Sequence, residues 1–396
     1  MTINSTASTL LALYISVAEA QGISPAMLRG TTQNDILKEY IARNTYIYPP
    51  RQSIRLIGDM IQYCSKHVPQ WYPISISGYH MREAGSNAIQ ELAFTFANAI
   101  EYIKTCTERG LKVDDFAPRL SFFFCCTMEF FEEIAKFRAA RRIYSKIMKE
   151  RFGAKNEKSY HLRFHVQTSG ESLTAQQVDN NIVRVTMEAL AAVLGGCQSL
   201  HTNSKDEALA LPTEESVKIA LRTQQIVASE SGACKTVDPM AGSFYLEYLT
   251  NRIETEVGKY LSRIDKMGGA LIAIEKGYFQ DEIRQNAYKL KREIDNGERV
   301  IVGVNKFRDA HDIEPELNRI DTEIEKRQVK KLKDFKAMRD GTKVDGVIEQ
   351  LQRAAEHQEE NLMPHIISAV KGHVTLGEIS DVFVDIFGRY EPKFSF

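Results

Sequence analysis

The sequence has no excess of charge of either sign. Its 396 residues include 51 Lys and Arg against 52 Asp and Glu, a formal net charge of -1. Proteins that bind nucleic acid or anionic membranes through general electrostatics carry a basic surplus, so this balance argues against both kinds of partner. The sequence also lacks an apolar run of the ~18 residues that a membrane-spanning helix requires. We therefore expect no nucleic-acid and no membrane partner.

A stretch near the start, 9–20, resembles the apolar core of a signal peptide. No Lys or Arg precedes it, since Arg29 is the first basic residue of the chain. Signal peptides carry a positive charge before their apolar core, so we predict an amphipathic helix over 9–20 instead.

The six cysteines form no C-x-x-C pair. In a chain of this length we interpret them as reduced, mostly buried thiols of a cytoplasmic protein. The sequence has no H-E-x-x-H, no G-x-S-x-G and, after its strand-like runs, no G-x-G-x-x-G or G-x-x-x-x-G-K-[ST]. We therefore predict no metal site and no dinucleotide or P-loop domain, and we find no hydrolase signature.

Short strand-like runs alternate with helix-length segments up to about residue 245. This alternation is typical of parallel strands joined by right-handed helical crossovers, and it predicts a (β/α)8 TIM barrel. The predicted strands lie at 28–32, 74–77, 119–124, 161–166 and 198–202, with helices at 88–109 and 128–152 between them.

After about residue 245 the pattern is helical and dense in charge. Apolar residues at helical spacing mark helices within 253–264, 317–324 and 344–354. We interpret the lysines at 330–333 as a solvated helix face. The sequence thus predicts a barrel domain at 1–245 and a helical region at 246–396.

Three predicted strands carry polar side chains on one face. Packed barrels fill their interior with Val, Ile and Leu, whereas a polar interior indicates a channel for a long, partly polar ligand, because unpaired buried polar groups are costly. An α+β sheet with one solvent-facing side would give the same alternation. The polar faces carry Ser75, Ser77 and Tyr79 on one strand, Arg119, Ser121 and Phe123 on the second, and His161, Arg163, His165 and Gln167 on the third.

Seven segments, most of them at the ends of these strands, form a consistent set. They read TQNDILKE (32–39), RNTYIYPP (43–50), SISGYHM (75–81), QTSG (167–170), SLHTN (199–203), LMPHII (362–367) and TLGEI (375–379). Together they resemble the large subunits of the methylmalonyl-CoA mutase family. The similarity runs in order from residue 1 to about residue 390.

The resemblance also implies two departures from the family. A segment like 1–4 lies near the end of the third barrel strand in that family, so we expect the first two strands and most of the third to be absent from this chain. We also expect no cobalamin-binding domain. The family's cobalt-binding loop reads D-x-H-x-x-G, and the nearest string, 309–314, has Glu314 in place of the glycine. We interpret that string as a chance match.

The resemblance implies a radical rearrangement with adenosylcobalamin as cofactor, in which the thioester group of an acyl-CoA moves between neighbouring carbons. His80 is similar to the residue that hydrogen-bonds the migrating carbonyl, and Tyr79 to an aromatic residue that packs over the substrate. Gln33 is similar to an amide that contacts the acyl group. Outside the matched segments, each would be interpreted as an ordinary structural residue.

Arg43 is similar to the arginine with which methylmalonyl members bind the free carboxylate of the substrate. Isobutyryl-type relatives have Gln at this position, so Arg43 favours a dicarboxylic acyl group. The other predicted substrate contacts are Thr31, Arg119, Ser121 and Phe123, with Arg119 at a coenzyme A phosphate.

Five further residues are similar to those that face the corrin and the adenosyl group. A carboxylate such as Glu207 suits a ribose diol. For Glu83 and Glu207 the alternative is an acidic residue stabilised by the dipole at a helix start. The predicted cofactor contacts are Glu83, His165, Gln167, Asn203 and Glu207.

We interpret the chain as the C-terminal part of a methylmalonyl-type mutase catalytic domain. An ethylmalonyl-CoA mutase would also keep Arg43. The alternative from another class is a truncated, non-catalytic chain that needs a companion subunit. Expected partners are an acyl-CoA substrate, a cobalamin-binding small subunit, an amino-terminal companion chain and further copies in a homo- or hetero-oligomer.

Overall fold

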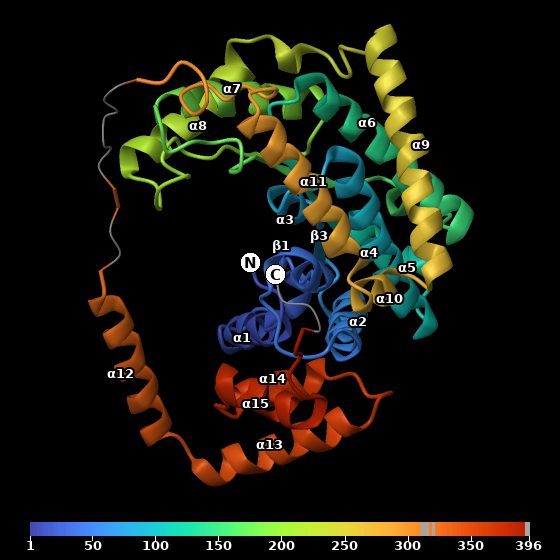
Figure 1. Ribbon diagram of the computed structural model, residues 1–396. Coiled ribbons are helices and arrows are strands. Elements are labelled where there is room, and N and C mark those ends of the chain that lie inside the picture. Colours follow the sequence, from blue (N-terminus) through green and yellow to red (C-terminus); the bar gives the residue numbers. More distant parts are fainter. Residues whose placement is uncertain (310–316, 319–320, 393–396) are drawn as a thin grey trace.

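The computed structural model describes residues 1–309, 317–318 and 321–392 and has a mixed α/β architecture with parallel strands (Figure 1). Its strands are β1 (Gly30–Thr31), β2 (Trp71–Tyr72), β3 (Ile74–Ser77), β4 (Leu120–Cys126), β5 (Phe164–Thr168) and β6 (Ser199–His201). The helices of the first half are α1 (Ala7–Ala20), α2 (Pro50–His67), α3 (Tyr79–Glu83), α4 (Ala88–Glu108), α5 (Val113–Phe116), α6 (Phe130–Lys146), α7 (Asn180–Leu194) and α8 (Glu214–Ser229). The helices of the second half are α9 (Phe244–Met267), α10 (Ala270–Glu275), α11 (Tyr278–Asp295), α12 (Glu323–Met338), α13 (Gly341–Glu356), α14 (Met363–Lys371) and α15 (Leu376–Phe387).

The strands form one parallel run with a break in it. Strands β3, β4, β5 and β6 pair in that order, and β1 pairs with β2. Pro73, which lies between β2 and β3, has no N–H for a sheet ladder. The backbone N–H of Ser75 nevertheless donates to the carbonyl of Gln33 at 2.8 Å, so the run continues past the break. Beyond β1, the amino group of Met1 donates to the carbonyl of Thr31 at 2.7 Å.

The outer face of the sheet packs against helices. Ile74 and Ile76 of β3 and Phe122 and Phe124 of β4 alternate with the polar positions, and all four are buried in the main apolar cluster. Aromatic side chains of α4 and α6 cover them, for example Tyr144 with its ring centroid 5.0 Å from that of Phe122. Burying a side chain of this size contributes about 1.5–3 kcal/mol. The apolar positions of the alternations in β3 and β4 therefore face the helices.

Strand β5 begins later than the sequence predicted. The expected strand at 161–166 is in fact Phe164–Thr168, because the preceding residues are used elsewhere. The side chain of His161 is 53% exposed, and the guanidinium of Arg163 donates to the carbonyl of Pro118 at 2.7 Å. The assignment of His161 and Arg163 to the strand was therefore wrong, and of the four polar residues only His165 and Gln167 belong to β5.

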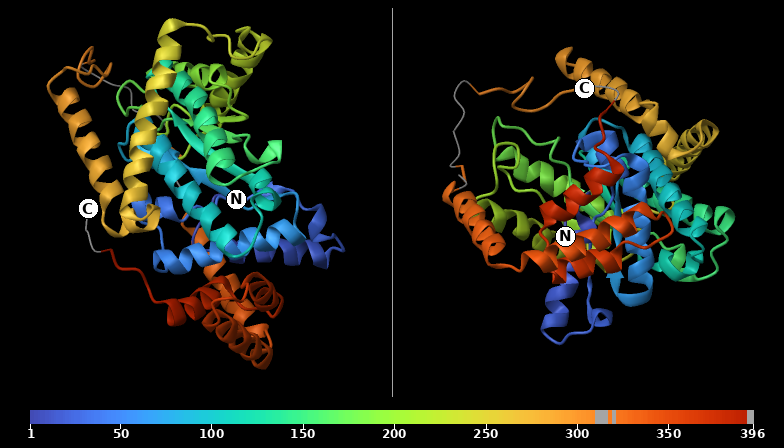
Figure 2. Two further views of the ribbon diagram at one scale, coloured as in Figure 1. Left: turned by 90° about the vertical axis from the view of Figure 1, so that its right-hand side faces the viewer. Right: turned by 90° about the horizontal axis from the view of Figure 1, so that it is seen from below.

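The second half of the chain contributes two groups of helices (Figure 2). Helix α9 packs along α4 and α6, outside the sheet. Helices α14 and α15 pack against α1, and α13 packs against α14 and α15, in a separate apolar cluster. The helix predicted within 317–324 begins at Glu323 as α12, and Ile320 lies outside the described residues. Lys330, Lys331 and Lys333 on α12 are all exposed, as the solvated helix face predicted.

All six cysteines are free thiols, and Cys64, Cys106, Cys125 and Cys126 are buried. The predicted helix over 9–20 is present as α1, with Leu11 and Ile15 buried. Within 1–309, 317–318 and 321–392, every helix is too short or too polar to cross a membrane.

Candidate active site

The candidate site lies at the carboxyl ends of the parallel strands, where α/β proteins of this kind hold their ligands. The short helix α3 follows β3 directly and carries Tyr79, His80 and Glu83. Gly78 joins the two elements. A Cβ at Gly78 would lie 2.6 Å from the hydroxyl oxygen of Thr95, so only glycine permits this close approach of α3 to α4.

A row of aromatic rings connects α3 with the sheet. Tyr79 stacks on Phe123 of β4, with ring centroids 4.8 Å apart and planes at 5°. His80 meets Phe123 edge to face at 5.7 Å, and His165 of β5 lies 5.2 Å from the same ring. The sheet register explains this order, because Ser77, Phe123 and His165 are paired neighbours on successive strands. The structure thus brings four predicted site residues together around one phenyl ring.

His80 is held neutral by its surroundings. Its side chain is buried, and burial, with the positive charges of Lys38 and Arg43, lowers the pKa of His80 to about 2. The Nε2 atom lies 3.4 Å from the Lys38 ammonium. The Nδ1 atom has no hydrogen-bond partner among the described residues. His80 therefore offers an uncharged ring with one nitrogen available.

Gln33 is linked to His80 through the Lys38 ammonium and is already engaged by the protein. Its side-chain oxygen accepts hydrogen bonds from Lys38 at 2.7 Å and from Asn4 at 3.1 Å. Sequence analysis gave no role to Lys38, which is fully buried and pairs with Glu39 at 3.0 Å. The sequence feature that could have indicated its burial is the Lys38–Glu39 pair between apolar residues, because charged residues in such a context are often buried as ion pairs.

Arg43 ends a π-helical turn that is anchored to the core. In this turn, Glu39–Arg43, Tyr40 and Ile41 are buried, whereas Arg43 is exposed. The hydroxyl of Tyr40 donates to the carbonyl of Tyr48 at 2.5 Å. Asn44 closes the turn in the left-handed region at φ 58°, a conformation that Asn tolerates better than most residues. The charge of Arg43 acts on both His80 and Lys38.

The predicted cofactor contacts on β5 and β6 form a second group. The Gln167 amide donates to the side-chain oxygen of Asn203 at 2.8 Å, and Thr168 holds Asn203 through its backbone and its hydroxyl. His165 bonds to the hydroxyl of Ser199 at 2.7 Å, and burial, with His201, lowers the pKa of His165 to about 4. These side chains are neutral hydrogen-bonding groups on the inner face of the sheet.

Glu83 and Glu207 differ in their surroundings. Glu83 accepts hydrogen bonds from the hydroxyl of Ser169 at 2.7 Å and from the backbone of Glu171 at 3.0 Å, and burial raises its pKa. Its carboxyl group therefore already ties α3 to the loop after β5. Glu207 is exposed in the loop after β6, four residues beyond Asn203.

The remaining predicted substrate residues lie toward the other end of the strands. Arg119 immediately precedes β4, with its guanidinium 5.2 Å from the ring centroid of Tyr72, and it lines a cavity of about 110 Å³. The hydroxyl of Ser121 donates to the carbonyl of Ile74 at 2.9 Å. Thr31 is exposed at the end of β1. Arg119, Ser121 and Phe123 thus trace a line along β4 toward His80.

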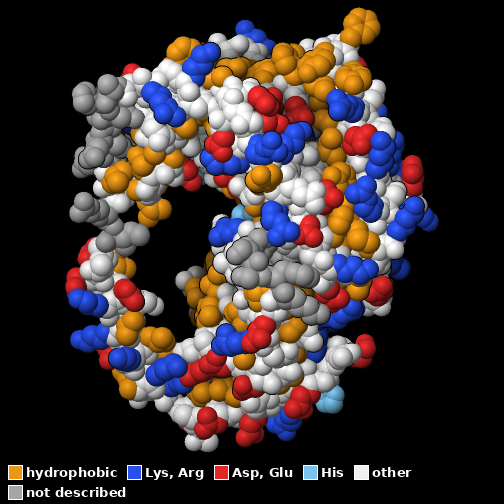
Figure 3. Space-filling view, viewed as in Figure 1, with side chains coloured by type: hydrophobic (Ala, Val, Ile, Leu, Met, Phe, Trp, Pro, Cys, Tyr) orange, Lys and Arg blue, Asp and Glu red, His pale blue; other side chains and the backbone are white. Residues whose placement is uncertain are grey.

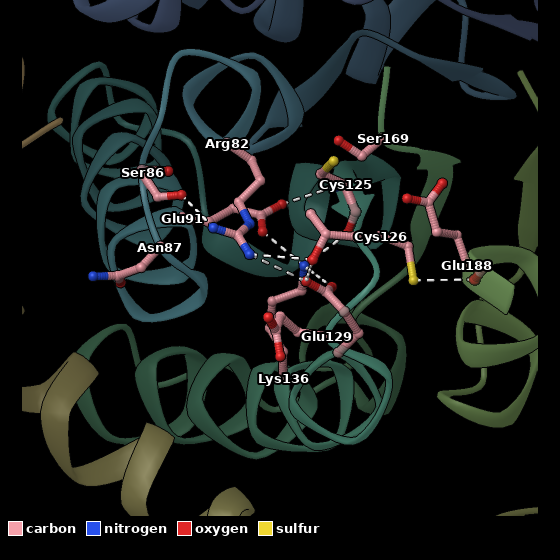
Figure 4. A network of polar contacts seen from close by, with 12 residues as sticks. Arg82, Ser86, Asn87, Glu91, Cys125, Cys126, Glu129, Lys136, Ser169 and Glu188 are labelled. Carbon is pink, nitrogen blue, oxygen red and sulfur yellow. Dashed lines mark hydrogen bonds and ion pairs between the residues drawn. The ribbon is translucent and has the colours of Figure 1, made fainter. Parts of the chain in front are cut away.

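A buried ionic network, which the sequence did not indicate, supports α3 and β4 from behind (Figure 4). Lys136 of α6 donates to Glu91 at 2.7 Å and to the carbonyl of Cys125 at 2.7 Å, while Glu91 accepts from the Cys125 N–H at 2.8 Å. Lys136 also pairs with Glu133, which in turn faces Arg82 of α3 at 3.6 Å. The two carboxylates and two cations balance in charge.

The network governs the charge state of its members. Burial disfavours the charged form of Glu133, but Lys136 and Arg82 outweigh it and hold the pKa of Glu133 below its usual range. Glu133 and Lys136 are wholly buried. Arg82 is separated from His80 by one residue, so the network fixes the helix that carries the aromatic row.

Comparison with known proteins gives one consistent result. The family profile described as Methylmalonyl-CoA mutase matches residues 1–389. The chain is 47% identical, over 98% of its length, to the 2-hydroxyisobutanoyl-CoA mutase large subunit of Aquincola tertiaricarbonis, and covers 69% of that protein. It is 49% identical over 98% of its length to methylmalonyl-CoA mutase of Escherichia coli (strain K12), covering 54% of it, and 45% identical over 99% to the human mitochondrial enzyme, covering 52%. The chain therefore spans about half the length of the methylmalonyl-CoA mutases that it matches.

Proposed function

We propose a function from one established premise, that the chain belongs to the methylmalonyl-CoA mutase family. We infer that it forms part of the catalytic subunit of an acyl-CoA mutase, an isomerase that moves a thioester group between neighbouring carbons. The observation that carries the proposal is the buried, neutral His80 with a free Nδ1, packed beside Phe123 at the carboxyl ends of the strands.

The shape of the polar strand face supports a coenzyme A ester as substrate. Arg119 and Phe123 are four residues apart on and before β4, which corresponds to roughly 13 Å of extended chain. A pantetheine arm is a long, partly polar ligand that would lie along such a face. Arg119 would hold a phosphate at one end, and Tyr79 and Phe123 would enclose the acyl group at the other.

His80 would act as an uncharged hydrogen-bond donor to the thioester carbonyl. A neutral imidazole with a pKa far below neutrality is a poor general acid but a suitable fixed dipole. The aromatic rings around it exclude water from the reacting carbons. Gln33 would orient the acyl group only in concert with Lys38, because Lys38 already donates to its side-chain oxygen.

Members of this family depend on adenosylcobalamin, which when bound supplies the radical that starts the rearrangement. The residues on β5 and β6 fit an adenosyl group in chemical type, because His165, Gln167 and Asn203 present neutral donors and acceptors. Glu207 would reach ribose hydroxyls, whereas Glu83 would act mainly by fixing α3. We propose that a separate cobalamin-binding subunit supplies most of the contacts to the corrin.

Arg43 favours a dicarboxylic acyl group such as methylmalonyl. Its side chain is exposed and its charge acts on His80, so a free carboxylate bound there would be its ion-pair partner. A 2-hydroxyisobutanoyl group, named for one relative, has no second carboxylate to pair with it. An ethylmalonyl group would satisfy Arg43 equally and remains the alternative.

Arg43→Gln should shift the substrate preference toward monocarboxylic acyl-CoA esters. Removing a charged hydrogen bond costs about 3 kcal/mol, or about a hundredfold in kcat/KM for succinyl-CoA, with little change for butyryl-CoA. Steady-state kinetics with both substrates on the reconstituted enzyme would measure the ratio. Arg51→Gln, a change at an exposed arginine paired with Glu275, serves as the control. An unchanged ratio in Arg43→Gln would remove Arg43 from the substrate site.

The open edges of the sheet favour a companion polypeptide. Among the described residues, β6 pairs with β5 on one side only, and an unpaired edge invites a further strand. Figure 3 shows an open space between α12 and the body of the molecule. Apolar residues of α12 that are partly exposed, such as Leu332 and Phe335, would be buried by a partner placed there. We propose that 1–245 is part of a TIM barrel completed by such a chain, that 246–396 is its helical extension, and that the assembly is an oligomer in the cytoplasm.

Reconstitution tests the proposed function. The chain with adenosylcobalamin and methylmalonyl-CoA should show no turnover, and a cobalamin-binding subunit alone should not restore it. Adding the portions of the E. coli relative that lie outside the matched region, as separate polypeptides, should produce succinyl-CoA. The term "large subunit" in the name of one relative points to such separate subunits. Failure of the complete mixture, with a stable complex formed, would favour the alternative of a non-catalytic chain.

A further inference from the structure

We propose that Lys38 is a positioning residue that holds the neutral imidazole of His80 in the tautomer with its proton on Nδ1. The hydrogen-bond acceptors around the buried Lys38 ammonium fix this tautomer. Only the use of the Nδ1 proton rests on the proposed function.

The Lys38 ammonium has three possible acceptors within 3.4 Å. Its Nζ atom lies 2.7 Å from the Gln33 oxygen, 3.0 Å from a Glu39 oxygen and 3.4 Å from His80 Nε2. An ammonium carries three protons and cannot accept a hydrogen bond. Each proton therefore has one partner, and Nε2 must be an acceptor.

The carboxylates of Glu39 and Asp35 favour the charged form of Lys38. Burial lowers the pKa of Lys38, whereas Glu39 and Asp35 act in the opposite direction. The Glu39 carboxylate is itself held by the amide of Asn4 at 2.6 Å. A wholly buried ammonium would be costly without these partners, so the cluster is organised to keep the positive charge in place.

The contact at Nε2 determines the protonation of the other ring nitrogen of His80, Nδ1. A neutral imidazole has one donor and one acceptor, and the group bonded to one nitrogen decides the role of the other. With Nε2 accepting from Lys38, Nδ1 carries the proton. Nδ1 is the nitrogen without a partner in the described residues. If the proposed function is correct, the Nδ1–H group is the donor to the thioester carbonyl.

Nitrogen NMR on the full chain labelled with 15N-histidine tests this without substrate or cofactor. His80 is assigned as the signals missing from His80→Gln. In the wild type, the His80 signals should show a protonated Nδ1 and an unprotonated Nε2. In Lys38→Met, Nε2 is no longer bound as an acceptor, so the exclusive Nδ1–H form should be lost and Nε2–H should become populated. Lys66→Met, a change at an exposed lysine of α2, should leave the wild-type pattern.

Each result decides the proposal. A wild-type His80 protonated on Nε2 would overturn it, and so would a Lys38→Met chain that keeps the pure Nδ1–H form. If Lys38→Met does not fold, as judged by circular dichroism, Lys38→Arg takes its place, because it keeps a cationic donor. Retention of the Nδ1–H form in folded Lys38→Arg supports the proposal, and a switch to Nε2–H contradicts it. Because no turnover is measured, failure of the mutase proposal would not be confused with failure of this one.

Discussion

His80→Ala should lower kcat of the reconstituted mutase about a hundred- to a thousandfold, the usual cost of losing one preorganised donor to a reacting carbonyl. The binding of the acyl-CoA should change little, because the carbonyl is one contact among the many along a pantetheine arm. In the proposed role, the donor would act on the migrating group, which would have to keep one orientation while it moves between two carbons. Steady-state kinetics on wild type and variant in parallel would give kcat and KM separately.

A matched histidine variant controls for general effects of the substitution. His357→Ala changes an exposed residue at the end of α13, away from the site, and should keep wild-type kinetics. If His80→Ala raised KM and left kcat unchanged, His80 would be a binding residue. The proposed role in the rearrangement would then be wrong.

Lys136→Met should destabilise the chain by about 3–5 kcal/mol, the range measured when one partner of a buried ion pair is removed. Glu91 and Glu133 would then face each other's charge with Arg82 as the remaining cation, and the backbone of Cys125 would lose a hydrogen bond. Urea unfolding followed by circular dichroism would measure the change. Lys146→Met on the same helix is the control, because Lys146 is 59% exposed and exposed ion pairs contribute about 0–1 kcal/mol.

The loss of unfolding free energy in Lys136→Met should also depend on pH. Without the ammonium, burial raises the pKa of Glu91 and Glu133 in the folded chain above their value in the unfolded chain. A carboxyl group with a raised folded pKa favours the folded state at low pH, and that contribution is lost as pH rises through the folded pKa. The deficit relative to wild type should therefore be larger at pH 8 than at pH 5. A deficit that is equal at both values would indicate a packing defect alone.

The sequence predicted those parts of the fold that depend on periodicity. The alternation in Ile74–Ser77 placed the isoleucines against the helices and the serines on the inner face, and the structure confirms this through the burial of Ile74 and Ile76 in the main cluster. The start of β5 was missed by three residues because His161 and Arg163 continue the alternation although they lie outside the strand. A period of two does not report where hydrogen bonding to a neighbouring strand begins.

The buried charges could not be predicted in the same way. Lys136 lies on a helix rich in charged residues, where a lysine ordinarily marks the exposed face. Its burial depends on Glu91, which is 45 residues away in the sequence. The partners of Lys38 are similarly divided between its own turn and His80, 42 residues away. Pairings over such separations are set by how the strands are ordered, and the local pattern of residues does not show that order.

The turn Glu39–Arg43 combines residues that are buried in the core with one exposed residue, Arg43, that is proposed to contact the substrate. The buried members, among them Tyr40, attach the turn to the core, while Arg43 extends from its last position without contributing to that attachment. If Arg43 binds the acyl carboxylate as proposed, replacing it would alter which acyl groups are accepted and leave the buried part of the turn in place. Changes at this one position would then separate substrate selectivity from folding stability.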